Sequence, residues 1–248
     1  MDYEIGEMTD ITPGTVELHD ARRDIRRTVK LEAFSISRCT LVRNGSDRPM
    51  SSMTWLEAVD LCNRLSSAHG LQSAYDINDR WVRWDVRADG FRLPTEAEWE
   101  YACRAGTAGP HYGDLQETAW TSLDGIDGPQ PVRRKQPNAF GLYDTLGNVW
   151  EWCWDYLDPA RYGDYRVFRG GSWADPPWSV RASTRRGSAP DAVVEGTGLR
   201  LARGAVGTDG PEGSEAAQGW SAAQDRARAS ISGPLPAGWT PLRELAVR

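Results

Sequence analysis

Apolar residues recur along the chain in short runs whose spacing predicts short elements of both kinds. Residues 29–36 alternate apolar and polar positions, which is the period-2 pattern of a half-buried strand. Residues 55–65 place apolar side chains at helical spacing, and either Ser52 or Thr54 can cap this helix. Residues 1–27 are polar and charged, and we expect them to form a solvated surface.

A second helix is expected after Pro94. Thr95 is the N-cap of this helix, Glu98 completes a capping box, and Gly106 ends the helix. Residues 75–86 predict a short hairpin, and residues 106–138, rich in Gly, Pro and Asp, predict a long loop region. Short helices, short strands and long loops together predict an α+β fold. Further strand patterns occur at residues 149–154, 166–169 and 198–202.

The composition changes after Arg203, where Gly, Ala, Glu and Ser become dominant, as is typical of a linker. We therefore expect one domain over residues 1–203, followed by a linker and C-terminal tail over residues 204–248. Trp220 and Trp239 are unusual in so polar a tail. They suggest that the tail docks, either on the domain itself or on a partner.

The chain has 248 residues and a formal net charge of −6, which argues against a generally basic nucleic-acid-binding protein. Its 12 Trp residues exceed the 8 Tyr and 4 Phe, and so aromatic a chain is not disordered overall. No stretch approaches the ~18 apolar residues of a membrane span, and the acidic N-terminus lacks the apolar segment of a signal peptide. We expect a cytoplasmic protein that binds neither nucleic acid nor membrane.

The four cysteines, Cys39, Cys62, Cys103 and Cys153, are widely spaced and form no C-x-x-C pair. This spacing indicates neither a zinc site nor a redox pair. Lone cysteines in a cytosolic chain are mostly small buried apolar residues, so we expect these four to lie in the core.

Four long motifs occur in order along the chain: residues 91–102 (FRLPTEAEWEYA), 137–152 (PNAFGLYDTLGNVWEW), 166–173 (RVFRGGSW) and 198–203 (GLRLAR). In sequence and in order they resemble the formylglycine-generating enzyme (sulfatase-modifying factor) family. The resemblance covers roughly residues 12–203. It implies a C-type-lectin-like α+β fold with little regular secondary structure.

The resemblance does not extend to the family's copper chemistry. Formylglycine-generating enzymes hold copper with two cysteines shortly after the Gly-Gly-Ser motif, because soft thiolates suit Cu(I). Here residues 173–180 contain no cysteine, and Asp175 stands near the position of the first one. We therefore expect no copper and no copper-dependent formylglycine generation.

Other members of the fold leave several activities open. Iron enzymes of the ergothioneine-pathway sulfoxide synthase type resemble this chain but use three histidines, partly from an extra helical domain. This chain has no room for that domain, and its histidines are His19, His69 and His111. The pyoverdine-maturing oxidase resembles the fold without the cysteine pair, whereas variable proteins of diversity-generating retroelements use a similar fold for binding.

The resemblance also implies the family's structural calcium site. Asp144 and Glu151 would supply side-chain oxygens, and Gly147 and Val149 would supply backbone carbonyls, an all-oxygen set that suits Ca²⁺. The alternative is that Asp144 caps a turn and Glu151 pairs with an arginine. We expect a structural Ca²⁺ at this place.

The candidate ligand-binding surface lies in the loops after the Gly-Gly-Ser motif. Arg and Trp are enriched at binding hot spots, and an arginine fork can hold a carboxylate or phosphate. We expect Trp178, Arg185 and Arg186 to be exposed, whereas the family positions of Trp173 and Arg181 suggest the core. The ligand-binding candidates are Asp175, Trp178, Arg181, Arg185, Arg186 and Glu195.

Two functions remain after these observations. The first is a non-catalytic module that recognises a peptide or protein partner. The second is an oxidative enzyme acting on a peptide or small metabolite, with a closed pocket near Asp175 and Glu195. The short stretch between residues 42 and 53, where family members have a longer one, leaves a more open surface and favours binding.

Overall fold

The computed structural model describes residues 3–20, 24–204, 217–222 and 224–225. Their helices and strands are short, and none of the helices within these ranges is long and apolar enough to cross a membrane. The elements are β1 (Tyr3–Glu4), β2 (Met8–Ile11), β3 (Gly14–Asp20), β4 (Ile25–Leu31), β5 (Phe34–Ser37), β6 (Val42–Arg43), α1 (Trp55–Ala68), β7 (Tyr75–Asn78), β8 (Trp81–Trp84), α2 (Glu96–Arg104), α3 (Leu115–Thr118), the 3₁₀ helix η1 (Ser122–Asp124), β9 (Trp150–Tyr156), α4 (Pro159–Tyr162), β10 (Arg166–Arg169), β11 (Arg185–Ser188), β12 (Thr197–Gly198) and β13 (Ala202–Arg203).

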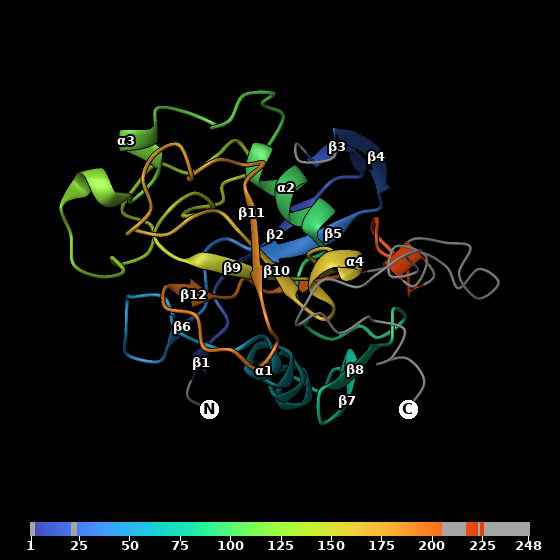
Figure 1. The fold of residues 1–248 in the computed structure, drawn as a ribbon. Helices are drawn as coiled ribbons and strands as arrows, with labels where there is room; N and C mark the ends of the chain where they lie inside the picture. The colour runs from blue at the N-terminus through green and yellow to red at the C-terminus, as the bar shows by residue number, and fades with distance from the viewer. Residues whose placement is uncertain (1–2, 21–23, 205–216, 223, 226–248) are drawn as a thin grey trace.

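The strands of the described residues form several small sheets. The largest has the order β11-β10-β9-β12, in which β12 runs parallel to β9 and the other pairs are antiparallel. A three-stranded sheet, β13-β5-β2, joins the end of the domain to its beginning. The four-stranded sheet lies at the centre, with α2 and α1 on opposite sides (Figure 1). The structure thus confirms the predicted α+β class.

Both long helices begin where the local sequence predicts. Thr54, rather than Ser52, caps α1, and its hydroxyl accepts a hydrogen bond from the backbone N–H of Glu57. Thr95 caps α2 with the predicted capping box to Glu98. The two helices therefore follow from signals within a few residues of each end.

The core on the α1 side is built from aromatic rings. Trp154 lies at its centre, with ring centroids 5.3 Å from Trp55, 5.0 Å from Tyr75 and 5.4 Å from Trp84. The guanidinium of Arg166 lies 3.9 Å from the ring centroid of Trp55, so this buried cation is held by aromatic faces. Much of the high Trp content is therefore used inside the domain.

The N-terminal residues 1–27 depart from the expected solvated surface. They contain β2, β3 and the start of β4, and β3 pairs with β4 along its whole length. Val16 is buried and Leu18 is partly buried against the core that also contains Ile11. The prediction followed the overall charge of the segment, whereas Val16 and Leu18 alternate with polar residues in the period-2 pattern of a half-buried strand.

Two further boundaries differ from the predictions. The strand expected over residues 29–36 is divided into β4 and β5, and the one expected over 198–202 into β12 and β13. Part of the expected tail, residues 217–222 and 224–225, packs back on the domain, and Trp220 joins the aromatic core. Trp239 lies outside the described residues.

Buried ion pairs connect α2 to the segment just before it and to the distant strands β10 and β11. Glu98 pairs with Arg92 through two hydrogen bonds of 2.7 Å, and Glu100 pairs with Arg169. Glu96 pairs with Arg185 and lies 3.4 Å from Arg169. Buried carboxylates need such partners, because an isolated buried charge is strongly destabilising.

Glu96 should make folding stability sensitive to acid. Burial by itself raises the pKa of this carboxyl, but Arg185 and Arg169 outweigh burial and lower the pKa from 4.5 to about 2. The stabilisation is therefore present above pH 4.5 and is lost as the pH falls toward 2. Between pH 5 and pH 2, the free energy of unfolding should fall by about 3 kcal/mol less in Glu96→Gln than in the unmodified protein. Urea unfolding at a series of pH values measures this difference.

The matched control is Asp60→Asn, because Asp60 pairs with Arg64 on the surface of α1, where both side chains are more than half exposed. Exposed pairs contribute little, so this variant should keep the acid sensitivity of the unmodified protein. Equal pH profiles for Glu96→Gln and the unmodified protein would contradict the assignment.

Candidate functional site

The loop that carries the candidate residues begins at two glycines in left-handed conformations. Gly170 has φ +101° and Gly171 has φ +86°. A Cβ on Gly170 would lie 2.8 Å from the carbonyl oxygen of Thr145, and one on Gly171 would lie 2.8 Å from Cγ2 of Val180. Only glycine fits this close approach, so the chain turns sharply into the loop of residues 173–181, here called the Trp178 loop.

Asp175 fixes the Trp178 loop from inside. The carboxylate is buried, and its Oδ2 accepts hydrogen bonds from the Ser172 N–H at 3.0 Å, the Ser172 hydroxyl at 2.6 Å and the indole N–H of Trp150 at 2.8 Å. Its Oδ1 lies 3.0 Å from Nη1 of Arg186. Both oxygens therefore hold the local structure.

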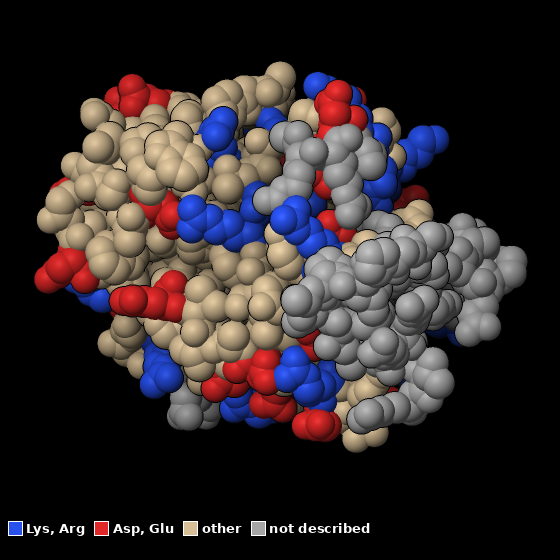
Figure 2. Space-filling view, viewed as in Figure 1, with Lys and Arg blue, Asp and Glu red and all other residues tan. Residues whose placement is uncertain are grey.

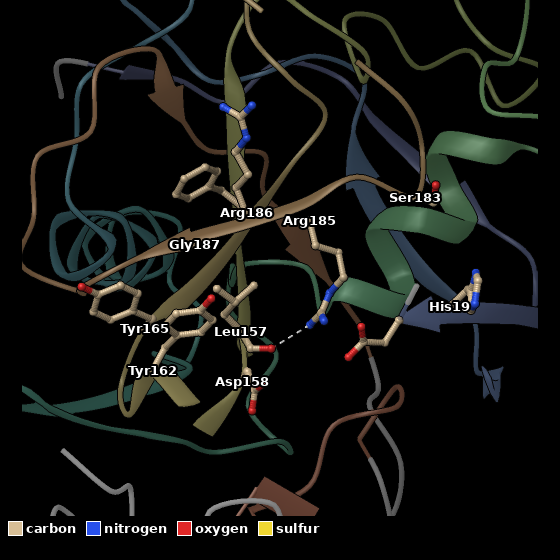
Figure 3. A pocket seen from close by; sticks show the side chains of 11 residues that line it. His19, Leu157, Asp158, Tyr162, Tyr165, Ser183, Arg185, Arg186 and Gly187 are labelled. Carbon is tan, nitrogen blue, oxygen red and sulfur yellow. Dashed lines mark hydrogen bonds between the residues drawn. The ribbon is translucent and has the colours of Figure 1, made fainter. Parts of the chain in front are cut away.

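Arg185 and Arg186 leave β11 on opposite sides, as consecutive strand residues do (Figure 3). Arg185 turns to α2, where it pairs with Glu96, and its guanidinium also donates to the carbonyl of Leu157 at 3.1 Å. Arg186 turns to Asp175, and its guanidinium lies 5.0 Å from the ring centroid of Trp150. Figure 2 shows a row of cationic side chains over β11.

The exposure of these residues agrees with the sequence only in part. Trp178 is 67% exposed and the Arg186 side chain is 44% exposed, as predicted. The Arg185 side chain is only 23% exposed, because Glu96 holds it against α2. Arg181, for which the family position suggested the core, is exposed and donates from Nε to the carbonyl of Trp178 at 2.6 Å.

Neighbouring loops border the Trp178 loop. The N–H of Ser122 donates to the carbonyl of Asp175 at 3.0 Å, which places η1 and its exposed Leu123 beside this loop. Glu195 is exposed and precedes Gly196, where an added Cβ would lie 3.4 Å from Cβ of Ser172. The structure thus pairs Asp175 with Arg186 and bonds Arg181 to the backbone of Trp178. Glu195 borders the same loop through its neighbour Gly196.

A pocket of about 530 Å³ lies beyond Arg185, between β11, α4 and the end of β3 (Figure 3). The rings of Tyr162 and Tyr165 stack on one of its walls with centroids 5.8 Å apart. The lining does not include Asp175 or Glu195, where a pocket was expected for an enzyme. Its residues are His19, Asp20, Leu157, Asp158, Tyr162, Tyr165, Phe168, Ser183, Arg185, Arg186 and Gly187.

The proposed calcium ligands are only partly available. Asp144 is buried with φ +55°, and its Oδ2 accepts from the N–H of Arg133 at 2.8 Å, as a turn cap does. Its Oδ1 has no hydrogen-bond partner among the described residues, and burial raises the pKa of this carboxyl. One unpartnered carboxylate oxygen is a group that fits a cation.

Glu151 has a different counter-ion. Its carboxylate pairs with Arg200 at 2.7 Å and 2.9 Å, and it also accepts the indole N–H of Trp99 at 2.6 Å. This is the arginine pairing that was the alternative to a cation. Gly147 and Val149 are buried beside it, and Gly147 lies against the backbone of Trp120. Within the described ranges, no group of three or more His, Cys, Asp and Glu side chains could hold a metal ion.

The cysteines lie in the core, as predicted, and all four are buried free thiols. Burial is the largest influence on three of them. It raises the pKa of Cys103 to about 12, and it raises the pKa of Cys62 and Cys153 well above the ordinary value. Because the thiolate is the reactive form, none of these three is a nucleophile at neutral pH.

Residues 37–205 match the family described as sulfatase-modifying factor enzyme 1-like domain. An inactive C-alpha-formylglycine-generating enzyme 2 of Bos taurus is 34% identical over 192 residues, which cover 66% of this chain and 64% of that protein. A formylglycine-generating enzyme of Streptomyces coelicolor is 36% identical over 163 residues, which cover 52% of this chain and 51% of that enzyme. The chain thus spans between about half and two thirds of these relatives.

Solved structures share the fold. Treponema denticola variable protein 1 superposes with a TM-score of 0.73 at 28% identity, covering 82% of this chain and 98% of that one. PvdO from Pseudomonas aeruginosa superposes with a TM-score of 0.65 at 22% identity, covering 80% of this chain and 94% of that one. The second likeness concerns the fold alone. Together these matches confirm the predicted fold.

Burial of the thiols leads to a measurable expectation. In the native protein, Cys39, Cys62, Cys103 and Cys153 should react with a thiol reagent such as dithionitrobenzoate only as fast as the protein unfolds. All four should react at once in denaturant. A thiol that reacts within seconds in the native state would contradict this assignment and would make that cysteine a candidate nucleophile.

Proposed function

Because the chain belongs to the family of sulfatase-modifying factor enzyme 1-like domains, we propose that it uses this scaffold as a non-catalytic module that recognises a peptide or protein partner. The observation that carries the proposal is the state of Asp175. The resemblance to formylglycine-generating enzymes places this residue near the position of their first copper-binding cysteine. Its carboxylate is neutralised by Arg186 and hydrogen-bonded by Ser172 and Trp150.

A carboxylate held in this way is poorly suited to catalysis. Acting as a base or as a metal ligand would require Asp175 to give up hydrogen bonds that close the Trp178 loop, and each lost partner would leave a buried polar group unsatisfied. The same hydrogen bonds are well suited to recognition. They hold the loop in one conformation before a partner arrives, which lowers the entropy lost on binding.

The loop presents a side chain suited to an interface. Trp178 is 67% exposed, whereas tryptophan is on average highly buried. Pro176 and Pro177 precede it and restrict the backbone. Arg181 donates to the carbonyl of Trp178, and Arg186 pairs with Asp175 of the same loop, so this surface combines an apolar side chain with two cationic ones. Binding hot spots are enriched in this combination of residue types.

Replacing the anchor should abolish binding without unfolding the domain. We expect Trp178→Ala to weaken partner binding by at least about tenfold, because a hot-spot aromatic contributes 2 kcal/mol or more. The free energy of unfolding should change by less than about 0.5 kcal/mol, because the ring is exposed. The measurement is quantitative affinity capture, followed by titration of each purified candidate partner against both proteins.

Trp81→Ala is the matched control, because Trp81 is another partly exposed tryptophan, on the β7–β8 hairpin. It should leave binding unchanged. Equal affinity of the Trp178→Ala and unmodified proteins for every captured partner would contradict the proposal. So would turnover of a peptide or metabolite that survives Trp178→Ala.

We also infer a structural Ca²⁺ at Asp144, supported by the unpartnered buried oxygen of this carboxylate. A ligand that binds only the folded state stabilises it, by about 2.7 kcal/mol at a concentration a hundred times the dissociation constant. Millimolar Ca²⁺ should therefore raise the melting temperature of the unmodified protein, chelation should reverse the effect, and Asp144→Ala should eliminate it. A melting temperature that does not change with Ca²⁺ would contradict this inference.

A further inference from the structure

Residues Ala217–Trp220 form a tight turn of defined shape, here called the C-terminal turn. The N–H of Trp220 donates to the carbonyl of Ala217 at 2.9 Å. Both central residues have positive φ, +48° at Gln218 and +85° at Gly219, as in a type I′ turn. The turn closes on itself and needs no neighbouring strand to define its conformation.

The domain recognises the polar groups of this turn. The Gln218 side chain accepts from the N–H of Glu32 at 2.7 Å and donates to the carbonyl of Glu32 at 3.0 Å, so it pairs with the backbone as a strand would. The carbonyl of Gln218 accepts from the Thr95 hydroxyl at 2.8 Å. The carbonyl of Gly219 accepts from the Arg27 guanidinium at 2.6 Å.

The apolar contacts are equally specific. A Cβ on Gly219 would lie 2.6 Å from Val29 and 3.2 Å from Ala97, so only glycine fits between β4 and α2. The Trp220 ring enters an aromatic slot, with centroids 5.6 Å from Trp84 and 5.4 Å from Trp154. The groove therefore selects a glutamine, a glycine and an aromatic ring in sequence.

The C-terminal turn lies outside the family domain in sequence, although it packs on that domain in space. The family match ends at residue 205, and the turn follows the Gly-, Ala-, Glu- and Ser-rich residues 205–216. All the contacts above reach residues that precede Arg203. The groove thus lies between the β4–β5 turn, the N-terminus of α2 and β8, on the right of Figure 1, where the orange-red segment lies.

We propose that this groove is a peptide-binding site for a β-turn of sequence Gln-Gly-Trp, and that the C-terminal turn is its exchangeable occupant in cis. A turn of the same chemistry supplied in trans competes for the same contacts. The tether gives the chain's own turn a high effective concentration, so the groove is filled at rest and opens only to a strong or abundant competitor. The site is separate from the Trp178 loop and does not depend on it.

The test uses the full chain with a specific protease site placed within residues 205–216. After cleavage of the folded protein, the C-terminal fragment should remain bound and co-elute with the domain in size-exclusion chromatography. A synthetic peptide of residues 215–227 should then displace the fragment in a concentration-dependent manner. The domain should keep its far-ultraviolet circular dichroism and a cooperative melting transition throughout.

Two variant peptides provide the specificity controls. Gly219→Val in the peptide should raise the concentration needed for displacement by at least about tenfold, because valine disfavours φ +85° and collides with Val29. Ala222→Ser should compete like the original, because Ala222 is exposed. Three results would overturn the proposal: unfolding of the cleaved domain, failure of a large peptide excess to displace the fragment, or equal competition by the Gly219→Val peptide.

Discussion

The carboxylates of α2 and their arginine partners are the constraint on which the rest of the structure depends. Glu96, Glu98 and Glu100 are buried in a helix of nine residues, and their partners come from outside the helix. Arg92 approaches from the segment before the helix, and Arg169 from β10. Because the strands are short, few backbone hydrogen bonds hold one element against another. The charged pairs therefore help to hold the sheets in place relative to α2. Leaving one partner unpaired would cost far more than the intact pair contributes, which enforces a single arrangement.

The same constraint extends to the Trp178 loop through strand geometry. Glu96 holds Arg185 on the α2 side of β11. Because consecutive side chains alternate across a strand, Arg186 must then face the other side, where it meets Asp175. Asp175 in turn closes the loop that exposes Trp178. An interaction in the core and a side chain in solvent are thus linked by two neighbouring residues of one strand.

Local signals in the sequence predict the parts of the fold that depend on neighbouring residues, and they miss the parts that depend on distant ones. Both helix caps are predicted because Thr54 and Thr95 bond within three residues of themselves. The pocket beside Arg185 is not predictable in this way, because its walls come from three distant stretches of chain. The contact of Gln218 with Glu32 spans 186 positions and leaves no periodic pattern in the sequence.

The same limit applies to the candidate site, where the sequence indicates single residues and does not reveal their distant partners. The motif resemblance identified Asp175, and the residue types of the loops pointed to Trp178 and Arg186. In the structure Asp175 pairs with Arg186. The sequence could not predict that Arg185 pairs with Glu96, 89 positions away, and is therefore only partly exposed. Glu151 illustrates the same limit, since its pairing with Arg200 depends on a partner 49 positions away.

The tryptophans explain how so little regular structure holds together. The indole N–H of Trp55 donates to the carbonyl of Cys153, that of Trp152 to the carbonyl of Met53, and that of Trp150 to Asp175. Each ring therefore fills volume and also forms a hydrogen bond between segments far apart in the chain, which a phenylalanine could not do. Trp220 differs in one respect, because its ring packs against distant residues while its indole N–H donates locally to Asp225. Trp178 differs from all of these because its ring extends into solvent, so its conformation is fixed by the loop beneath it and its surface remains available for a partner.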